Sequence, residues 1–194
     1  LYTLAFVALV AVGLLAGLAF KNLNTEQRKI LIKAGLWGGV VFGLVAIVQL
    51  IVASMDPTAF GTLCRGCKPE VFGFARINGL AAEPQFMASA LLPALFMAMI
   101  FRKSRRLSSW SLLLSSLAIA LSFSRGAFLA IVVALVAVVF TKILKRQSIG
   151  DLLRPILLMA TGVLIGFVLL VASATLRFAQ TPHITFNTTV SMVD

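Results

Sequence analysis

One arginine stands where a charge is costly. Arg125 lies in the stretch LSFSRGAFLA and is the only charged residue between positions 107 and 141. A guanidinium near the middle of a membrane costs about 2.5–3.5 kcal/mol, and less near the interface. Its planar fork suits two-pronged binding of phosphate oxygens, so Arg125 is a candidate ligand for a phosphate or diphosphate. The alternative is an arginine that snorkels to the lipid headgroups from the tip of a helical hairpin.

The residues on either side of Arg125 suit an anion site. Ser124 is placed to cap a helix that begins just after it, and Gly126 is expected to supply the backbone freedom for a tight reversal. The start of that helix would present unpaired N–H groups and the positive end of the helix dipole beside the guanidinium. We therefore expect Ser124, Arg125 and Gly126 to form one anion-binding turn.

A second polar stretch, ARINGLAAEPQFMA, occupies residues 75–88. Pro84 suits the first turn of a helix, and Glu83 beside it complements the helix dipole. Arg76 lies eight residues before Pro84, close enough to this helix start to fold back over the membrane surface and approach Arg125. Two arginines with a helix end would match a diphosphate. The alternative is an ion pair between Arg76 and Glu83 that fastens a loop. For Glu83 this structural role is the preferred interpretation.

The composition decides which elements position these residues. The chain is 60% hydrophobic and 12% charged, with a mean hydropathy of +1.05, against roughly 45–50% apolar residues in soluble domains. Four apolar blocks have the length that a helix needs to cross a membrane; they are residues 1–20, 34–55, 85–101 and 155–175. The class is therefore an all-α polytopic membrane protein.

The positive charge of the chain gathers between these blocks. Three clusters hold 12 of the 17 lysines and arginines; they are Lys21/Arg28/Lys29/Lys33, Arg102/Lys103/Arg105/Arg106 and Lys142/Lys145/Arg146/Arg154. If all three face the cytoplasm, the positive-inside rule is satisfied. The net charge of +11 then reflects orientation and anionic lipid headgroups, and not a nucleic-acid surface.

This orientation makes residues 107–141 a hairpin, because both flanking clusters must lie on one side. We expect two short helices, 107–123 and 126–141, that meet at the Ser-Arg-Gly turn. The predicted topology is one helical membrane domain over residues 1–194, with about six transmembrane helices and both ends in the periplasm. We interpret the chain as incomplete, with a large periplasmic loop and later spans missing.

The two polar stretches together resemble the O-antigen ligase and O-antigen polymerase superfamily of bacterial membrane glycosyltransferases. The resemblance is carried by the pattern R-x-x-G-x-x-x-E-P-x-x-x-A, which is Arg76, Gly79, Glu83, Pro84 and Ala88, followed by the S-R-G of residues 124–126. It implies a helical, metal-independent transferase without a cofactor in the bacterial inner membrane. It also implies that Arg125 binds the diphosphate of an undecaprenyl-linked glycan, with Arg76 in a similar role.

The resemblance implies a glycan chain or lipid A core as acceptor, and a histidine in a periplasmic loop as base. His183 lies in a local sequence unlike that loop, so no catalytic base is assigned in this chain. Two other classes stay open: a non-catalytic membrane subunit of a larger complex, and a transporter of an anionic lipid-linked substrate. Gln49 is the only strongly polar residue deep in a clean span, which is little support for a transporter.

The two cysteines, Cys64 and Cys67, are spaced as in a redox motif. No thioredoxin-like pattern surrounds them, and the chain has too few other ligands for a closed zinc site. A small disulfide in an outer loop is the preferred interpretation.

Overall fold

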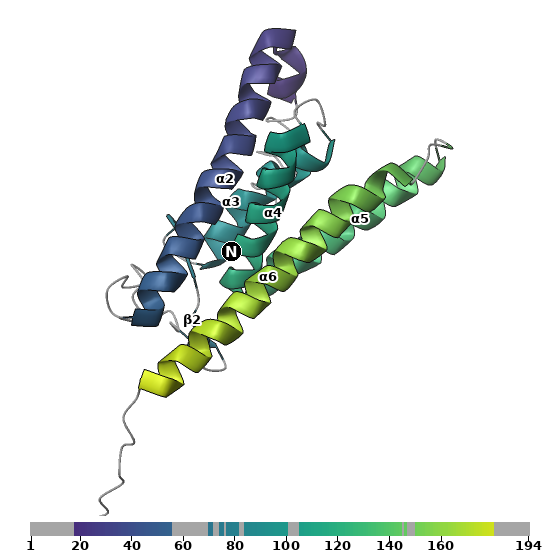
Figure 1. The fold of residues 1–194 in the computed structure, drawn as a ribbon. Coiled ribbons are helices and arrows are strands. Elements are labelled where there is room, and N and C mark those ends of the chain that lie inside the picture. Colours follow the sequence, from purple (N-terminus) through teal and green to yellow (C-terminus); the bar gives the residue numbers. More distant parts are fainter. Residues whose placement is uncertain are drawn as a thin grey trace, which may run out of the picture.

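The structure is a computed structural model that describes residues 18–55, 70–71, 74–75, 77–81, 84–100, 105–144, 146 and 150–180. Its elements are the helices α2 (Thr25–Met55), α3 (Pro84–Ile100), α4 (Arg105–Ser122), α5 (Arg125–Leu144) and α6 (Gly150–Gln180), with the two-residue strands β1 (Glu70–Val71) and β2 (Phe74–Ala75). The helices form an elongated bundle (Figure 1). Three of them, α2, α5 and α6, are long and apolar enough to cross a membrane, whereas α3 and α4 are apolar but shorter.

The predicted helical class is confirmed, and the largest boundary error lies at the start of α2. This helix begins at Thr25 instead of residue 34. Asn24 and Gln27 form a reciprocal cap: the Gln27 N–H donates to Asn24 Oδ1 (2.8 Å), and the Asn24 N–H donates to Gln27 Oε1 (3.0 Å). This capping box starts the helix within the basic segment, so charged residues extend α2 beyond the apolar block. The predicted span 1–20 lies outside the described residues up to position 17.

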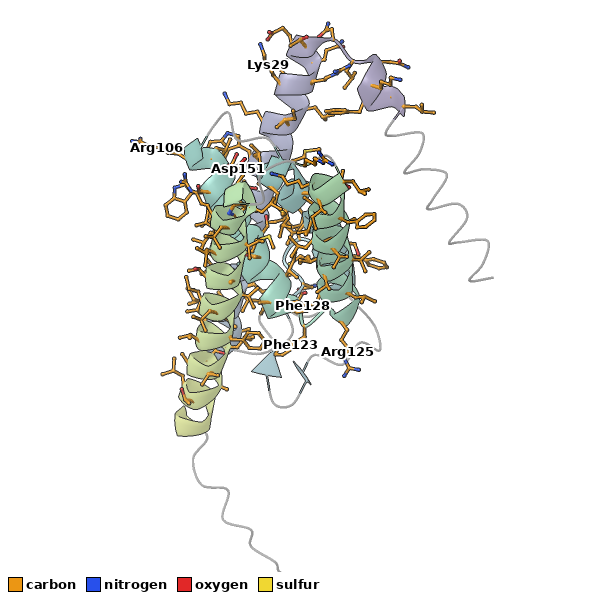
Figure 2. The ribbon with its side chains drawn as sticks, turned by 90° about the vertical axis from the view of Figure 1, so that its right-hand side faces the viewer. Lys29, Arg106, Phe123, Arg125, Phe128 and Asp151 are labelled. Atoms are coloured by element: carbon orange, nitrogen blue, oxygen red, sulfur yellow. The ribbon has the colours of Figure 1, made fainter. Side chains whose placement is uncertain are left out.

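The predicted hairpin over residues 107–141 is confirmed as α4, a short turn and α5. Lys29, Arg106 and Asp151 lie toward one end of the bundle, and Phe123 and Arg125 lie at the other (Figure 2). We call these the basic end and the turn end. The helix α4 therefore runs to the turn end and α5 returns. The count of six spans and the periplasmic placement of both chain ends stay predictions.

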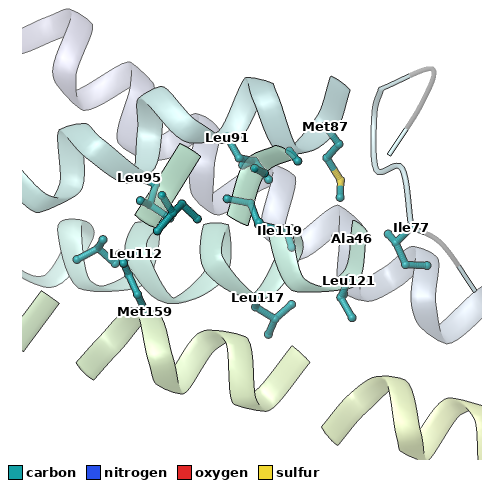
Figure 3. Close-up of a cluster of buried hydrophobic side chains, with 14 of the residues drawn as sticks. Ala46, Ile77, Met87, Leu91, Leu95, Leu112, Leu117, Ile119, Leu121 and Met159 are labelled. Carbon is teal, nitrogen blue, oxygen red and sulfur yellow. The ribbon is translucent and has the colours of Figure 1, made fainter. Parts of the chain in front are cut away.

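The centre of the bundle is α4, which is covered on three sides. Buried side chains of α4 such as Leu117 and Ile119 meet Ala46 of α2, Leu91 of α3 and Met159 of α6 in one apolar cluster (Figure 3). The helix also buries five serines, which are Ser108, Ser111, Ser115, Ser116 and Ser122. Some of these hydroxyls bond to their own helix, as Ser116 Oγ does to the Leu112 carbonyl (2.7 Å).

Glycines allow α2 and α6 to approach α4 closely. A Cβ built on Gly43 would lie 2.5 Å from Leu114 Cβ, and one built on Gly166 would lie 2.9 Å from Ala120 Cβ. A Cβ on Gly162 would meet the Ser116 hydroxyl. The small residues of α2 and α6 thus serve packing within the chain.

The helix α5 differs from the others because its surface is largely uncovered. Its buried residues are Ala127 and Ile131, and large apolar side chains such as Leu129, Val133 and Phe140 are exposed. A soluble monomer rarely exposes so continuous an apolar surface. This surface is typical of a helix that faces lipid.

Two glycines of α2 provide a matched test of this packing. We expect Gly43→Ala to lower the stability of the bundle by about 1–2 kcal/mol, because the new methyl group overlaps α4. Gly38→Ala adds the same methyl group where no atom lies within 4 Å, and it should be neutral or slightly stabilising. Thermal unfolding of the purified protein in detergent measures both. Equal midpoints for the two variants would contradict the close α2–α4 contact.

Candidate functional site

The turn between α4 and α5 is made by Phe123 and Ser124. Phe123 has a left-handed backbone, with φ of 50°, and its N–H donates to the Ala120 carbonyl (3.2 Å). This conformation costs a non-glycine residue about 1–2 kcal/mol. The Phe123 ring packs edge-on against Phe167 of α6, with ring centroids 6.4 Å apart. The contact places the strained residue against a second helix.

The prediction that Gly126 supplies the freedom for the reversal is wrong. Gly126 lies inside the first turn of α5, and Gly79 is the glycine with positive φ in the described part of the chain. The reversal is complete before Gly126, because Phe123 already turns the chain out of α4. What Gly126 provides is open space: a Cβ at this position would have no atom within 4 Å.

The prediction that Ser124 caps α5 is confirmed. Its Oγ accepts a hydrogen bond from the Ala127 N–H (3.4 Å), and its carbonyl accepts one from the Phe128 N–H (3.2 Å). Ser124 is itself buried, and its N–H donates to the hydroxyl of Ser122 (3.3 Å). These bonds fix the direction in which α5 leaves the turn.

Arg125 is the first residue of α5 and is exposed. Its side chain points away from the helices at the turn end (Figure 2). Among the described residues, no acceptor bonds to its guanidinium or to the N–H groups of Arg125 and Gly126. The turn therefore presents a cation and unpaired backbone donors on the same open side, which is the arrangement that binds an anion at a helix start.

The second polar stretch comes to the same end of the bundle. Ile77 is buried, and its N–H donates to the Leu121 carbonyl (3.2 Å) in the last turn of α4. Arg76 and Glu83 lie outside the described residues, as do Cys64, Cys67 and His183. The neighbour of Arg76 in the chain nevertheless contacts the helix that ends just before Arg125. The fold thus brings the two polar stretches together.

Gln49 of α2 holds this loop from the other side. Its Nε2 donates to Asn78 Oδ1, and its Oε1 accepts from the Gly79 N–H (2.6 Å). Both Gln49 and Asn78 are buried, and Asn78 Nδ2 also donates to the Ala81 carbonyl (2.9 Å). The side-chain amide of Gln49 therefore satisfies two polar groups of the loop at once.

Gly79 completes the bend of the loop. Its φ is 57°, and a Cβ at this position would lie 2.6 Å from Met87 Sδ of α3. The positive φ favours glycine at this position, and a larger residue would also displace the Met87 side chain. Further along the chain towards the N-terminus, β1 pairs with β2 in antiparallel fashion, and β2 packs beside α6. The described parts of residues 70–81 thus contact α2, α4 and α6.

Sequence reasoning missed the roles of Asn78 and Gln49. The sequence offers a transport role as the functional interpretation of Gln49 and gives Asn78 no role. The available signal was a lone amide in an apolar helix together with an Asn-Gly pair in a nearby loop. In the described ranges, no three side chains of His, Cys, Asp or Glu gather where they could hold a metal ion.

Searches of protein-family models, curated proteins and solved structures gave no match to this chain. The geometry of the turn end and the sequence patterns therefore carry the functional proposal.

Proposed function

We propose that this chain is part of a membrane glycosyltransferase that binds the diphosphate of an undecaprenyl-linked glycan at the turn end. The observation that carries the proposal is the Ile77–Leu121 hydrogen bond (3.2 Å). It brings the segment after Arg76 to the end of α4, next to the turn that presents Arg125. Two arginines and the start of α5 would then face one diphosphate.

In the proposed reaction, a hydroxyl of the acceptor glycan attacks the anomeric carbon of the donor. The bond between this carbon and the diphosphate oxygen breaks, and undecaprenyl diphosphate leaves with the electron pair. The hydroxyl proton passes to a general base that we do not assign. Arg125, the free N–H groups of α5 and Arg76 stabilise the negative charge of the leaving group.

The proposed setting is the inner membrane of a bacterium, with the turn end on the periplasmic side. The basic residues Lys29 and Arg106 lie toward the opposite end (Figure 2), which fits the positive-inside rule. The exposed apolar surface of α5 would face lipid or a partner protein. A ligase and a polymerase would share this donor site and would differ in the acceptor, either lipid A core or another glycan.

The proposal predicts a preference for two phosphates. We expect undecaprenyl diphosphate to bind the purified chain in nanodiscs roughly tenfold more tightly than undecaprenyl monophosphate, because a second charge-assisted contact forms. Displacement of radiolabelled undecaprenyl diphosphate by each unlabelled lipid measures the two affinities. Equal affinities would contradict a diphosphate site.

A further inference from the structure

A pocket of about 260 Å³ opens at the basic end, far along the bundle from Arg125. We call it the basic-end pocket. Three helices line it, through Ala98 of α3, through Ser108, Ser109 and Leu112 of α4, and through Arg154 and Leu158 of α6. The proposed transferase site uses none of these residues.

The polar side of the pocket can bind an anion. Arg154 is exposed, and its Nη2 lies 3.5 Å from Ser109 Oγ. Within the described ranges, Ser109 is the hydrogen-bond partner found for the Arg154 guanidinium, and this contact is weak. The nearby carboxylate of Asp151 instead pairs with Lys142 of α5 (3.9 Å). The charge of Arg154 is therefore not neutralised by the described carboxylates.

The other side of the pocket is apolar. Leu112 of its lining is buried, and Ala98 and Leu158 add methyl groups from two further helices. A small soluble anion gains nothing from such a wall, whereas a phospholipid carries a phosphate directly above apolar chains. The polar side of the pocket therefore fits the phosphate of a phospholipid, and the apolar side fits the start of its acyl chains.

The surroundings of the pocket favour a lipid with net negative charge. Two further arginines are exposed near the ends of the helices that line the pocket. Arg106 lies in the first turn of α4, and Arg146 lies between α5 and α6. Basic residues next to membrane helices attract anionic lipids by about 1 kcal/mol each. A zwitterionic lipid would gain little of this attraction.

We propose that the basic-end pocket binds the phosphate of an anionic phospholipid, with Arg154 and Ser109 as its ligands. Phosphatidylglycerol is the probe, and native mass spectrometry of the full chain released from detergent counts the lipids retained. We expect Arg154→Gln to weaken retention about tenfold, because one charge-assisted contact is lost. Arg106→Gln removes the same charge outside the pocket, where only the general attraction for anionic headgroups is lost, and should weaken retention clearly less than Arg154→Gln does.

Four outcomes would overturn the proposal. The first is equal retention by Arg154→Gln and the parent protein, and the second is equal weakening by both arginine variants. The third is equal retention of phosphatidylcholine, which would remove the anionic preference. Displacement of the lipid by millimolar inorganic phosphate would make a soluble phosphate the ligand and overturn the lipid assignment. Because Arg154 is exposed, its variant should fold, and an unchanged thermal midpoint checks this.

Discussion

Replacing Arg125 with alanine is expected to slow glycan transfer by roughly one to three orders of magnitude, or about 2–4 kcal/mol of transition-state stabilisation. The guanidinium would stabilise charge that grows on the departing diphosphate, so its loss affects the chemical step. The side chain is exposed and the described residues offer it no partner, so the fold should tolerate the change. Glycan transfer in cells that carry each variant, with protein level checked by immunoblot, gives the measurement.

The substitution Arg125→Lys distinguishes phosphate binding by Arg125 from snorkelling to the lipid headgroups. Arg125→Lys keeps the charge but loses the two-pronged geometry, so we expect transfer to fall sharply here too. A snorkelling arginine would be replaced freely by lysine, since both reach the headgroups. Arg106→Ala, at the basic end, is the matched control and should keep transfer. Near-normal activity of both Arg125 variants would refute the diphosphate site.

Replacing Gln49 with leucine is expected to destabilise the protein by about 2–4 kcal/mol. The change leaves two polar groups of the loop without a partner, Asn78 Oδ1 and the Gly79 N–H, and each such group costs about 1–3 kcal/mol when buried. Leucine has a similar volume, so packing alone should change little. Thermal unfolding in detergent measures the loss, and hydrogen exchange at residues 77–81 should rise.

The control for Gln49→Leu is Val48→Leu, which changes an exposed apolar residue on the same turn of α2. It should leave both stability and exchange unchanged. If Gln49→Leu released the loop, the proposed binding of undecaprenyl diphosphate should also weaken, because residues 77–81 would no longer be fixed beside the end of α4. Unchanged exchange at residues 77–81 in Gln49→Leu would show that α2 does not hold the loop.

The sequence allowed the helices to be predicted better than their ends. Runs of apolar residues indicate where a helix crosses hydrocarbon, so α3, α4 and α5 lie close to their predicted ranges. Charged residues beyond an apolar run do not indicate whether the helix continues. The start of α2 at the Asn24–Gln27 cap therefore could not be predicted from hydropathy. The central position of α4 could not be predicted either. Its serines lower its mean hydropathy, so its sequence does not indicate that three other helices cover it.

At the candidate site, local chemistry was predictable and distant contacts were not. Ser124 could be identified as a cap because a cap depends on residues three positions apart. The error at Gly126 came from assuming that a reversal requires glycine, whereas packing against Phe167 accompanies the left-handed backbone of Phe123. The bond between Gln49 and Asn78 joins residues on separate elements, and no local pattern encodes such a pairing.

The buried serines of α4 lie where the glycines of α2 and α6 approach it most closely. In the described structure, the hydroxyls of Ser111 and Ser115 have no hydrogen-bond partner and lie beside Gly39 of α2, while Ser116 lies beside Gly162 of α6. Removing α2 or α6 would uncover a face of α4 that close contact with their glycines otherwise covers. Because α4 packs against both α2 and α6, we expect these three helices to unfold together in one transition.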